Sequence, residues 1–340
     1  MNHLRFKGHH YEIGFRWGSL LAGYGNYILD QVPFPITEER IAFGRQCRPV
    51  YEKFFPEILE EIRGLSEGQK SSPQKLQAVL FSMYAMPPAE HCSCFAVSSK
   101  EQLLLGRNSD FLTEIEEFNK NVVYDFTSDS YGFNGNTTAF LEMEDGINER
   151  GLAVGMTSVF SKHIQPGMNS GMLLRFFLEK CSTVDEVIKW LYKIPIASAQ
   201  TFTVADLTGD ISVIECCADG IHIRKPEEER PYVCTVNRFH SPELEKWNTG
   251  EVDDWLSSQR YETMEKTLSR EAPQMDISIA KELLSGKKGF ICQYDRDTGK
   301  DTVWSVIYDL KHHKIYRAEG NPARCVYQED QRVVFQHNKQ

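Results

Sequence analysis

Residues 92–107, CSCFAVSSKEQLLLGR, constrain the fold more than any other stretch of this chain. Two apolar runs, 92–97 and 103–107, flank the polar segment Ser98–Glu101, which is the pattern of a β-hairpin. The unbroken apolar run Leu103–Leu105 is typical of a strand that is buried on both faces. Such a strand needs a covering layer on each side, so the hairpin is expected in the middle of a layered fold.

The hairpin also predicts a reactive thiol. With the turn centred between Ser99 and Lys100, an antiparallel pairing places Cys92 opposite Arg107, and Asp110 follows just beyond that end. Opposed side chains have Cβ atoms about 4.5–5.5 Å apart. A guanidinium at that distance favours the thiolate form of a cysteine. The pairing therefore predicts a charged thiol site built from one hairpin.

The rest of the chain is expected to be helical up to residue 90 and mixed after it. Ile13, Trp17 and Leu21 have helical spacing, and Ser72 before Pro73 is a helix start. Runs rich in Val, Ile, Thr and Phe predict further strands at 121–126, 137–144, 151–158, 200–206, 211–216 and 302–308, with helices at 171–182, 184–193, 255–269 and 276–285. This order predicts an α+β protein in which helices cover sheets. No linker or repeat divides the chain, so residues 1–340 are expected to form a single domain.

Composition excludes several classes of function. Hydrophobic residues make up 41% and charged residues 25% of the chain, as in ordinary globular proteins. The net charge of -10 argues against a nucleic-acid partner, and no apolar run is long enough to cross a membrane. Nine irregularly spaced cysteines, without a signal peptide at the N-terminus, indicate reduced thiols in the cytoplasm.

Two simpler interpretations compete with the thiol site. Most buried cysteines are inert packing, and this interpretation is kept for Cys94, Cys181, Cys234 and Cys292. The segment His91–Cys94 could also supply imidazole and thiolate ligands to a metal ion. No second pair of ligands at the usual spacing accompanies it, so no metal and no cofactor are predicted.

Seven segments in order resemble the cysteine N-terminal-nucleophile (Ntn) hydrolases, in particular the choloylglycine-hydrolase group and its acyltransferase relative, isopenicillin N acyltransferase. The hairpin is one of them: its ends "CSCF" and "GRNSDF" resemble the nucleophile strand and the segment that closes the next strand. The other matching segments are GHHYEIGFRWGS, EEIRGLSEG, GINERGLAVG, CTVNRF, SSQRY and TVWSVIYD.

This resemblance implies a four-layer αββα sandwich and a self-processing precursor. The Cys92 thiol would attack the carbonyl of His91, which would separate residues 1–91 from residues 92–340. The new α-amino group, with an ordinary pKa of about 7.7–8.0, could then act as the base for its own thiol. The implied activity is hydrolysis or acyl transfer on linear carbon–nitrogen (amide) bonds.

The resemblance also implies residue roles. Cys92 would be the nucleophile, Arg107 would lie beside its thiolate, and Asp110 would orient the amine. Asn237 would donate to the oxyanion, and Arg260 would complete the charged network. Thr157 or Ser158 would give a second oxyanion contact. Phe160 would bind substrate, in an apolar rim that also includes Phe133, Met156 and Trp304.

Three positions depart from the family pattern. His91 replaces a glycine, Cys94 replaces a small residue and Ser109 replaces a tryptophan. The expected partner is a small-molecule amide substrate with an apolar acyl group, and a homo-oligomer is left open. Two alternatives also stay open: hydrolysis against acyl transfer, and an inactive homologue that binds an acylated ligand without cleaving it.

Overall fold

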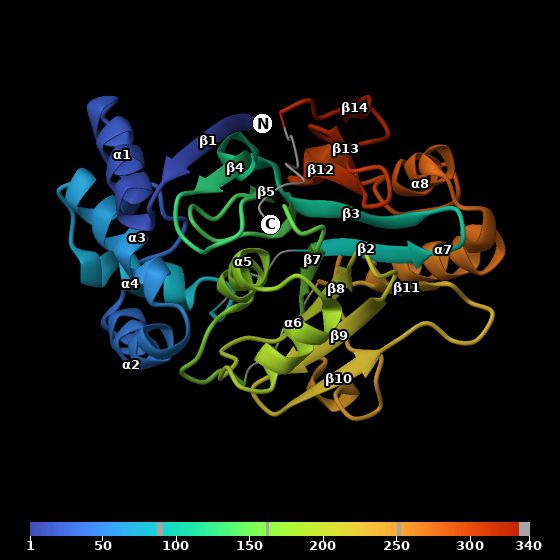
Figure 1. The fold of residues 1–340 in the computed structure, drawn as a ribbon, viewed down its shortest axis with the longest axis horizontal. Coiled ribbons are helices and arrows are strands. Elements are labelled where there is room, and N and C mark those ends of the chain that lie inside the picture. Colours follow the sequence, from blue (N-terminus) through green and yellow to red (C-terminus); the bar gives the residue numbers. More distant parts are fainter. Residues whose placement is uncertain (87–90, 161–162, 250–252, 333–340) are drawn as a thin grey trace.

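The structure is a computed structural model that describes residues 1–86, 91–160, 163–249 and 253–332. Two β-sheets lie face to face, and helices cover the outer face of each (Figure 1). This arrangement confirms the predicted α+β class and its four αββα layers.

The larger sheet has eight strands. In spatial order these are β1 (Asn2–Gly8), β4 (Lys120–Phe126), β5 (Phe133–Thr137), β6 (Asp145–Asn148), β7 (Ala153–Ser158), β8 (Gln200–Ala205), β9 (Ile211–Cys217) and β10 (Gly220–Arg224). Strand β1 pairs with β4 in parallel, and the remaining pairs are antiparallel. The predicted strand at 137–144 is wrong: β5 ends at Thr137, and the next residues form a buried turn before β6.

The smaller sheet has six strands and carries the hairpin. In spatial order these are β11 (Tyr232–Thr235), β2 (His91–Ser98), β3 (Leu103–Leu112), β12 (Lys300–Asp309), β13 (Lys314–Ala318) and β14 (Gln328–Glu329). Strand β3 lies between β2 and β12, and Leu103–Asp110 is buried throughout. This confirms the expectation that the run Leu103–Leu105 is covered on both faces.

Two groups of helices form the outer layers. The first group shares the core of the eight-stranded sheet and consists of α1 (His10–Gly23), α2 (Glu38–Phe54), α3 (Pro56–Gly68), α4 (Pro73–Ser82), α5 (Ser170–Lys180) and α6 (Val184–Leu191). Of these, α1, α5 and α6 pack on the strands, and α2, α3 and α4 pack mainly on other helices. The second packs on the six-stranded sheet and consists of α7 (Ser257–Glu271) and α8 (Ile277–Leu284). Short 3-10 turns lie at Ile28–Asp30, Thr113–Phe118, Glu245–Trp247, Ala272–Gln274 and Arg296–Thr298.

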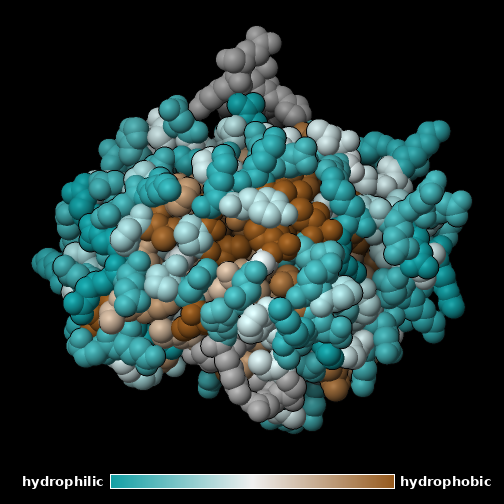
Figure 2. All heavy atoms as spheres, turned by 90° about the horizontal axis from the view of Figure 1, so that it is seen from below, coloured by the Kyte–Doolittle hydropathy of each residue, from teal (hydrophilic) through white to brown (hydrophobic). Residues whose placement is uncertain are grey.

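Local sequence explains several of these boundaries. Helix α4 begins with Pro73 after Ser72, whose hydroxyl accepts the Lys75 N–H, as the sequence predicted. The inner faces of both sheets share one apolar cluster that includes Ala96 and Leu105 from one sheet and Ile147 and Val213 from the other. On the face drawn in Figure 2, apolar side chains gather in a hollow surrounded by polar ones. Within the described residues, no helix is long and apolar enough to span a bilayer.

Candidate active site

The β2–β3 hairpin has a different register from the predicted one. Cys92 lies opposite Ser109, and Cys94, not Cys92, lies opposite Arg107. The turn is therefore centred one residue later than expected, and the Ser99 N–H donates to the Gln102 carbonyl. Because side chains alternate with a period of two, this shift of two in pairing leaves every side chain on its expected face. The polar residues of the loop gave no hydrophobic signal that could fix the centre of the turn.

Arg107 nevertheless contacts the Cys92 thiol, as the hairpin predicted. Its Nη2 atom lies 2.8 Å from Cys92 Sγ, on the diagonal of the pairing rather than directly across it. Its Nη1 donates to Asp145 Oδ2 at 2.8 Å, and its Nε donates to the Met156 carbonyl at 2.9 Å. Both Cys92 and Arg107 are fully buried. A fixed cation beside a buried sulfur stabilises the thiolate, which is the nucleophilic form.

Two carboxylates hold this arginine, and sequence reasoning missed both. Asp145 also accepts hydrogen bonds from Trp304 Nε1 at 2.9 Å and the Tyr308 hydroxyl at 2.6 Å. Glu144 Oε2 lies 3.8 Å from Arg107 Nη2. Both acids are fully buried, and they directly precede the motif GINERG. The sequence pattern predicts a strand over 137–144, which gives no sign that Glu144 and Asp145 turn toward Arg107.

Asn237 and Arg260 bind the backbone of Cys92. The Cys92 N–H donates to Asn237 Oδ1 at 2.8 Å, and Arg260 Nη1 donates to the Cys92 carbonyl at 2.6 Å. Arg260 Nη2 also donates to Asn237 Oδ1 at 3.0 Å, and Asn237 Nδ2 donates to the Ser158 carbonyl at 2.8 Å. Asn237 follows β11, and Arg260 lies in the first turn of α7. The structure thus brings these two side chains to the residue that the sequence singled out.

Asp110 lies on the opposite face of β3 from Arg107 and is paired in register with His91. Its carboxylate accepts from the Thr302 hydroxyl at 2.6 Å and the Tyr294 hydroxyl at 2.9 Å. Arg260 Nη1 lies 3.6 Å away. Burial raises the pKa of Asp110 from 3.8 to about 6, and Arg260 and these hydroxyls partly offset that rise. Asp110 thus lies opposite His91 in the hairpin, and burial raises its pKa to about 6.

The proposed second oxyanion residues lie beside this group at the end of β7. The Thr157 hydroxyl donates to the Val236 carbonyl at 2.8 Å, and the Ser158 carbonyl accepts from Asn237. Phe160 is partly buried just beyond the strand. The other three predicted rim residues do not line a rim: Phe133, Met156 and Trp304 are at most 3% exposed. Their apolar character reflects packing between the layers.

The second thiol differs from the first. Burial raises the pKa of Cys94 to about 12, so this thiol stays protonated at neutral pH. All nine cysteines lie in described segments, and none forms a disulfide. Among the described residues, no cluster of three or more His, Cys, Asp or Glu side chains could hold a metal ion.

An apolar cavity lies next to the carboxylates. Its volume is about 110 Å³. Its lining is mostly aromatic and aliphatic: Gln31, Pro33, Phe34, Met83, Tyr84, Met86, Phe111, Ile115, Phe118, Thr138, Ala139 and Phe140. Tyr84 and Thr138 donate their hydroxyl hydrogens to Glu144 Oε1, at 3.2 and 2.8 Å. The cavity is therefore connected to the thiol through Glu144 and Arg107.

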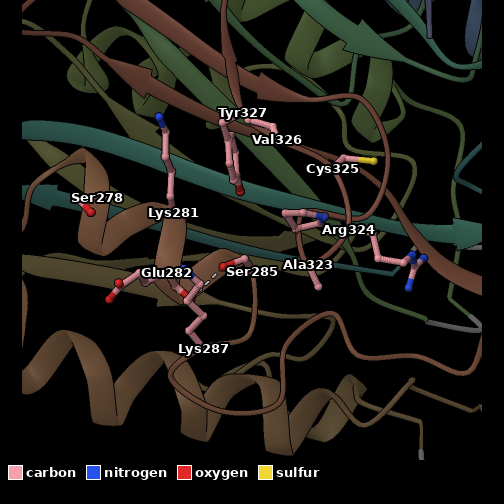
Figure 3. Close-up of a pocket in the computed structure, with 11 residues that line it drawn as sticks. Ser278, Lys281, Glu282, Ser285, Lys287, Ala323, Arg324, Cys325, Val326 and Tyr327 are labelled. Carbon is pink, nitrogen blue, oxygen red and sulfur yellow. Dashed lines mark hydrogen bonds between the residues drawn. The ribbon is translucent and has the colours of Figure 1, made fainter.

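A larger cleft of about 470 Å³ lies elsewhere, between α8 and residues 322–327. Lys281, Ser285 and Tyr327 border it, as Figure 3 shows. Lys287 and Arg324 add positive charge. The cleft contains none of the side chains around Cys92, so the apolar cavity is the better candidate for a substrate site.

Comparison with known proteins gives a family match. Residues 97–324 match the family described as acyl-coenzyme A:6-aminopenicillanic acid acyl-transferase. This is about two thirds of the chain, and it begins just after Cys92. No curated protein matches the sequence.

Two solved structures are similar. The penicillin V acylase from Agrobacterium tumefaciens is 15% identical, with a TM-score of 0.46 over 67% of this chain and 82% of that chain. A mutant of the conjugated bile acid hydrolase from Clostridium perfringens is 14% identical, with a TM-score of 0.47 over 73% of this chain and 95% of that chain.

Proposed function

Because the chain belongs to the acyl-coenzyme A:6-aminopenicillanic acid acyl-transferase family, we propose that it is an amide-acting enzyme of the Ntn type that cleaves linear amides through a thioester on Cys92. The observation that carries this proposal is the 2.8 Å contact between Arg107 Nη2 and Cys92 Sγ. The proposal includes a precursor that cuts itself between His91 and Cys92.

The precursor needs the cut because its thiol has no base on the same residue. An amide nitrogen is not basic, so the Cys92 N–H can only donate, as it does to Asn237 Oδ1 at 2.8 Å. After cleavage the same nitrogen is an amine that can accept the thiol proton. Asn237 and Asp110 then hold this amine in place, and Arg107 balances the thiolate charge.

Turnover proceeds in two steps on the same sulfur. The thiolate attacks the substrate carbonyl, the amine leaves with a proton from the Cys92 α-amino group, and a thioester remains. Water or a second amine then resolves the thioester, which gives hydrolysis or acyl transfer. Asn237 Nδ2 and the end of β7 at Thr157 and Ser158 would stabilise the oxyanion. Each such donor typically contributes about 10²–10³ in rate.

The apolar cavity is the proposed acyl site. Phe111, Phe118 and Phe140 line it with aromatic rings, and Met83 and Met86 line it with flexible apolar side chains. The chemistry of this lining favours an apolar or aromatic acyl group. Residues from both sides of the proposed cut line the cavity, so both fragments are needed for binding.

Two assays on the purified protein test this function. Intact mass shows whether the chain is present as residues 1–91 and 92–340, with Cys92→Ala as the uncut control. Activity is then measured on penicillin V, conjugated bile acids, N-acyl homoserine lactones and N-acyl amino acids, and on 6-aminopenicillanic acid with an acyl-coenzyme A. Release or transfer of an apolar acyl group is expected, and exclusive cleavage of short charged amides would contradict the proposed substrate class.

The alternative function is an inactive homologue that binds an acylated ligand. An uncut chain that binds acyl amides without turnover would favour it. A Cys92→Ala protein that still separates after His91 would contradict self-processing by this thiol. A cut mapped to the bond before Cys94 would identify Cys94, and not Cys92, as the nucleophile.

We place the protein in the cytoplasm as one domain over residues 1–340. All nine thiols are in the reduced state that a cytoplasm maintains. A small-molecule amide is the proposed partner. Size-exclusion chromatography with light scattering would establish whether the chain forms a homo-oligomer.

A further inference from the structure

The side chain of His91 stacks on Trp255. The two rings are nearly parallel, with centroids 4.5 Å apart and an interplanar angle of 13°. Trp255 is buried at 6% exposure, and the edge of Tyr294 contacts it at a centroid distance of 5.5 Å. His91 Nδ1 is buried and has no hydrogen-bond partner among the described residues. Stacking, not hydrogen bonding at this nitrogen, therefore fixes the ring.

The segment that carries Trp255 has an unusual backbone. Trp255 and Leu256 have φ angles of 52° and 58°, so two successive non-glycine residues are left-handed. Such residues persist only where their surroundings impose the conformation. Here Asp253 Oδ1 accepts the Trp255 N–H at 3.0 Å, and Asp253 also pairs with Lys300. The strain is located beside the predicted cleavage position.

The same segment is joined to the residues that hold Cys92. The Trp255 carbonyl accepts from Arg260 Nε at 3.0 Å, and the Asp254 carbonyl accepts from Arg260 Nη2 at 2.9 Å. Arg260 in turn donates to the Cys92 carbonyl at 2.6 Å. One arginine thus links the backbone of the segment that carries Trp255 to the backbone of Cys92.

The bond between His91 and Cys92 is consequently held from both ends. Asn237 and Arg260 fix the Cys92 end through its N–H and carbonyl. Trp255 holds the His91 end through its side chain. Attack on a carbonyl is fast only when the reacting atoms are kept close and aligned, and loss of that alignment lowers the rate.

We propose that Trp255 is a positioning residue for self-processing, which stacks on His91 and keeps its carbonyl in line with the Cys92 thiol. In this step a bond forms between Cys92 Sγ and the His91 carbonyl carbon, and the carbon–nitrogen bond breaks. The nitrogen takes the thiol proton. Water then cleaves the thioester, which leaves a carboxylate on His91 and restores the thiol.

This inference rests on the proposed self-processing and adds to it a residue outside the predicted set. The family resemblance has glycine where this chain has His91, so the stack is a feature of this sequence. A glycine would offer no ring to hold. The histidine and its tryptophan partner supply a restraint on the side of the bond that Asn237 and Arg260 do not reach.

The test follows the cut by intact mass during cell-free synthesis of the full chain. Trp255→Ala is expected to slow cleavage about two- to tenfold, the rate effect of one aromatic pair. Trp255→Phe keeps a stacking ring and should restore most of the rate. Trp247→Ala is the matched control, because Trp247 is a partly buried tryptophan that contacts a different histidine, His163.

A double-mutant cycle separates positioning from general stability. His91→Ala should slow cleavage to a similar degree, and the double variant His91→Ala/Trp255→Ala should be no slower than either single variant. Additive effects, or cleavage of Trp255→Ala at the parent rate, would overturn the inference while the parent still cuts itself. A parent chain that is never cut would overturn self-processing as well. If Trp255→Ala fails to fold, the cleavage rates of Trp255→Phe and His91→Ala are compared instead. A slow His91→Ala beside a nearly normal Trp255→Phe supports the inference, and cleavage of His91→Ala at the parent rate overturns it.

Discussion

The guanidinium of Arg107 contacts the sulfur of Cys92 at 2.8 Å, although the two residues are not opposite each other in the hairpin. The residue opposite Arg107 is Cys94, whose thiol burial keeps protonated with a pKa of about 12. The direction of one arginine side chain therefore distinguishes two thiols that are two residues apart. Asp145 fixes that direction from the neighbouring sheet.

Cys94→Ser should leave both self-processing and amidase activity within a fewfold of the parent. Burial raises the pKa of the Cys94 thiol to about 12, so this thiol stays protonated at neutral pH and is not expected to act as a nucleophile. Iodoacetamide labelling with mass spectrometry checks this assignment: label should appear on Cys92 and not on Cys94. Loss of activity in Cys94→Ser together with retained activity in Cys92→Ser would reverse it.

Gly155→Ala should damage the site without touching a reactive group. A Cβ at Gly155 would lie 2.8 Å from Cys94 Sγ and 3.1 Å from Arg107 Cδ, so the arginine would have to move. We expect turnover to fall at least about tenfold and the protein to lose roughly 1–3 kcal/mol of stability through overpacking. Gly23→Ala is the matched control, because nothing lies within 4 Å of its added Cβ. Equal turnover in parent and Gly155→Ala would mean that Arg107 is not needed in this position.

Much of the fold was predictable because the relevant signals are local. The apolar run at Leu103–Leu105, the cap at Ser72 and the helix spacing at 184–193 each depend on a few neighbouring residues. The strand expected at 137–144 failed for a physical reason. Thr137 and Phe140 have strand-like character, but Glu142 and Glu144 are fully buried, and Glu144 contacts Ser109 and Arg107 of the other sheet.

The site was predictable only in part. Cys92, Arg107 and Asp110 share one hairpin, so their proximity follows from the sequence pattern. Asp145 and Trp255 come from other layers, and no spacing in the sequence relates them to Cys92. Their roles depend on how the two sheets and α7 pack together, which local patterns do not encode.

Asn237→Ala should lower kcat by about 10²–10³ and change KM little, because an oxyanion contact strengthens in the transition state. Asn237→Asp is the informative companion, since it keeps the acceptor for the Cys92 nitrogen but removes the Nδ2 donor. Both variants should therefore be slow, and steady-state kinetics on already cleaved protein would show it. A rise in KM alone would make Asn237 a binding residue instead.

The titration of Asp110 should appear in stability and in activity. Burial raises the pKa of this carboxyl from 3.8 to about 6, so folding favours its protonated form. Its contribution to stability is present in full below pH 3.8 and is lost as the pH rises through 6. Relative to Asp110→Asn, the parent should thus lose up to about 3 kcal/mol of unfolding free energy between pH 4 and pH 7.

Urea unfolding at several pH values measures this difference. Asp297→Asn, which changes an exposed carboxylate, serves as the control and should show no comparable trend. Turnover should rise with pH over the range in which stability falls, because only ionised Asp110 can hold the positively charged form of the Cys92 amine. We expect turnover of the parent to fall at acid pH, where Asp110 becomes protonated, and Asp110→Asn to be slow at every pH. If a partly active Asp110→Asn protein shows the same fall in turnover at acid pH as the parent, the titrating group is not Asp110.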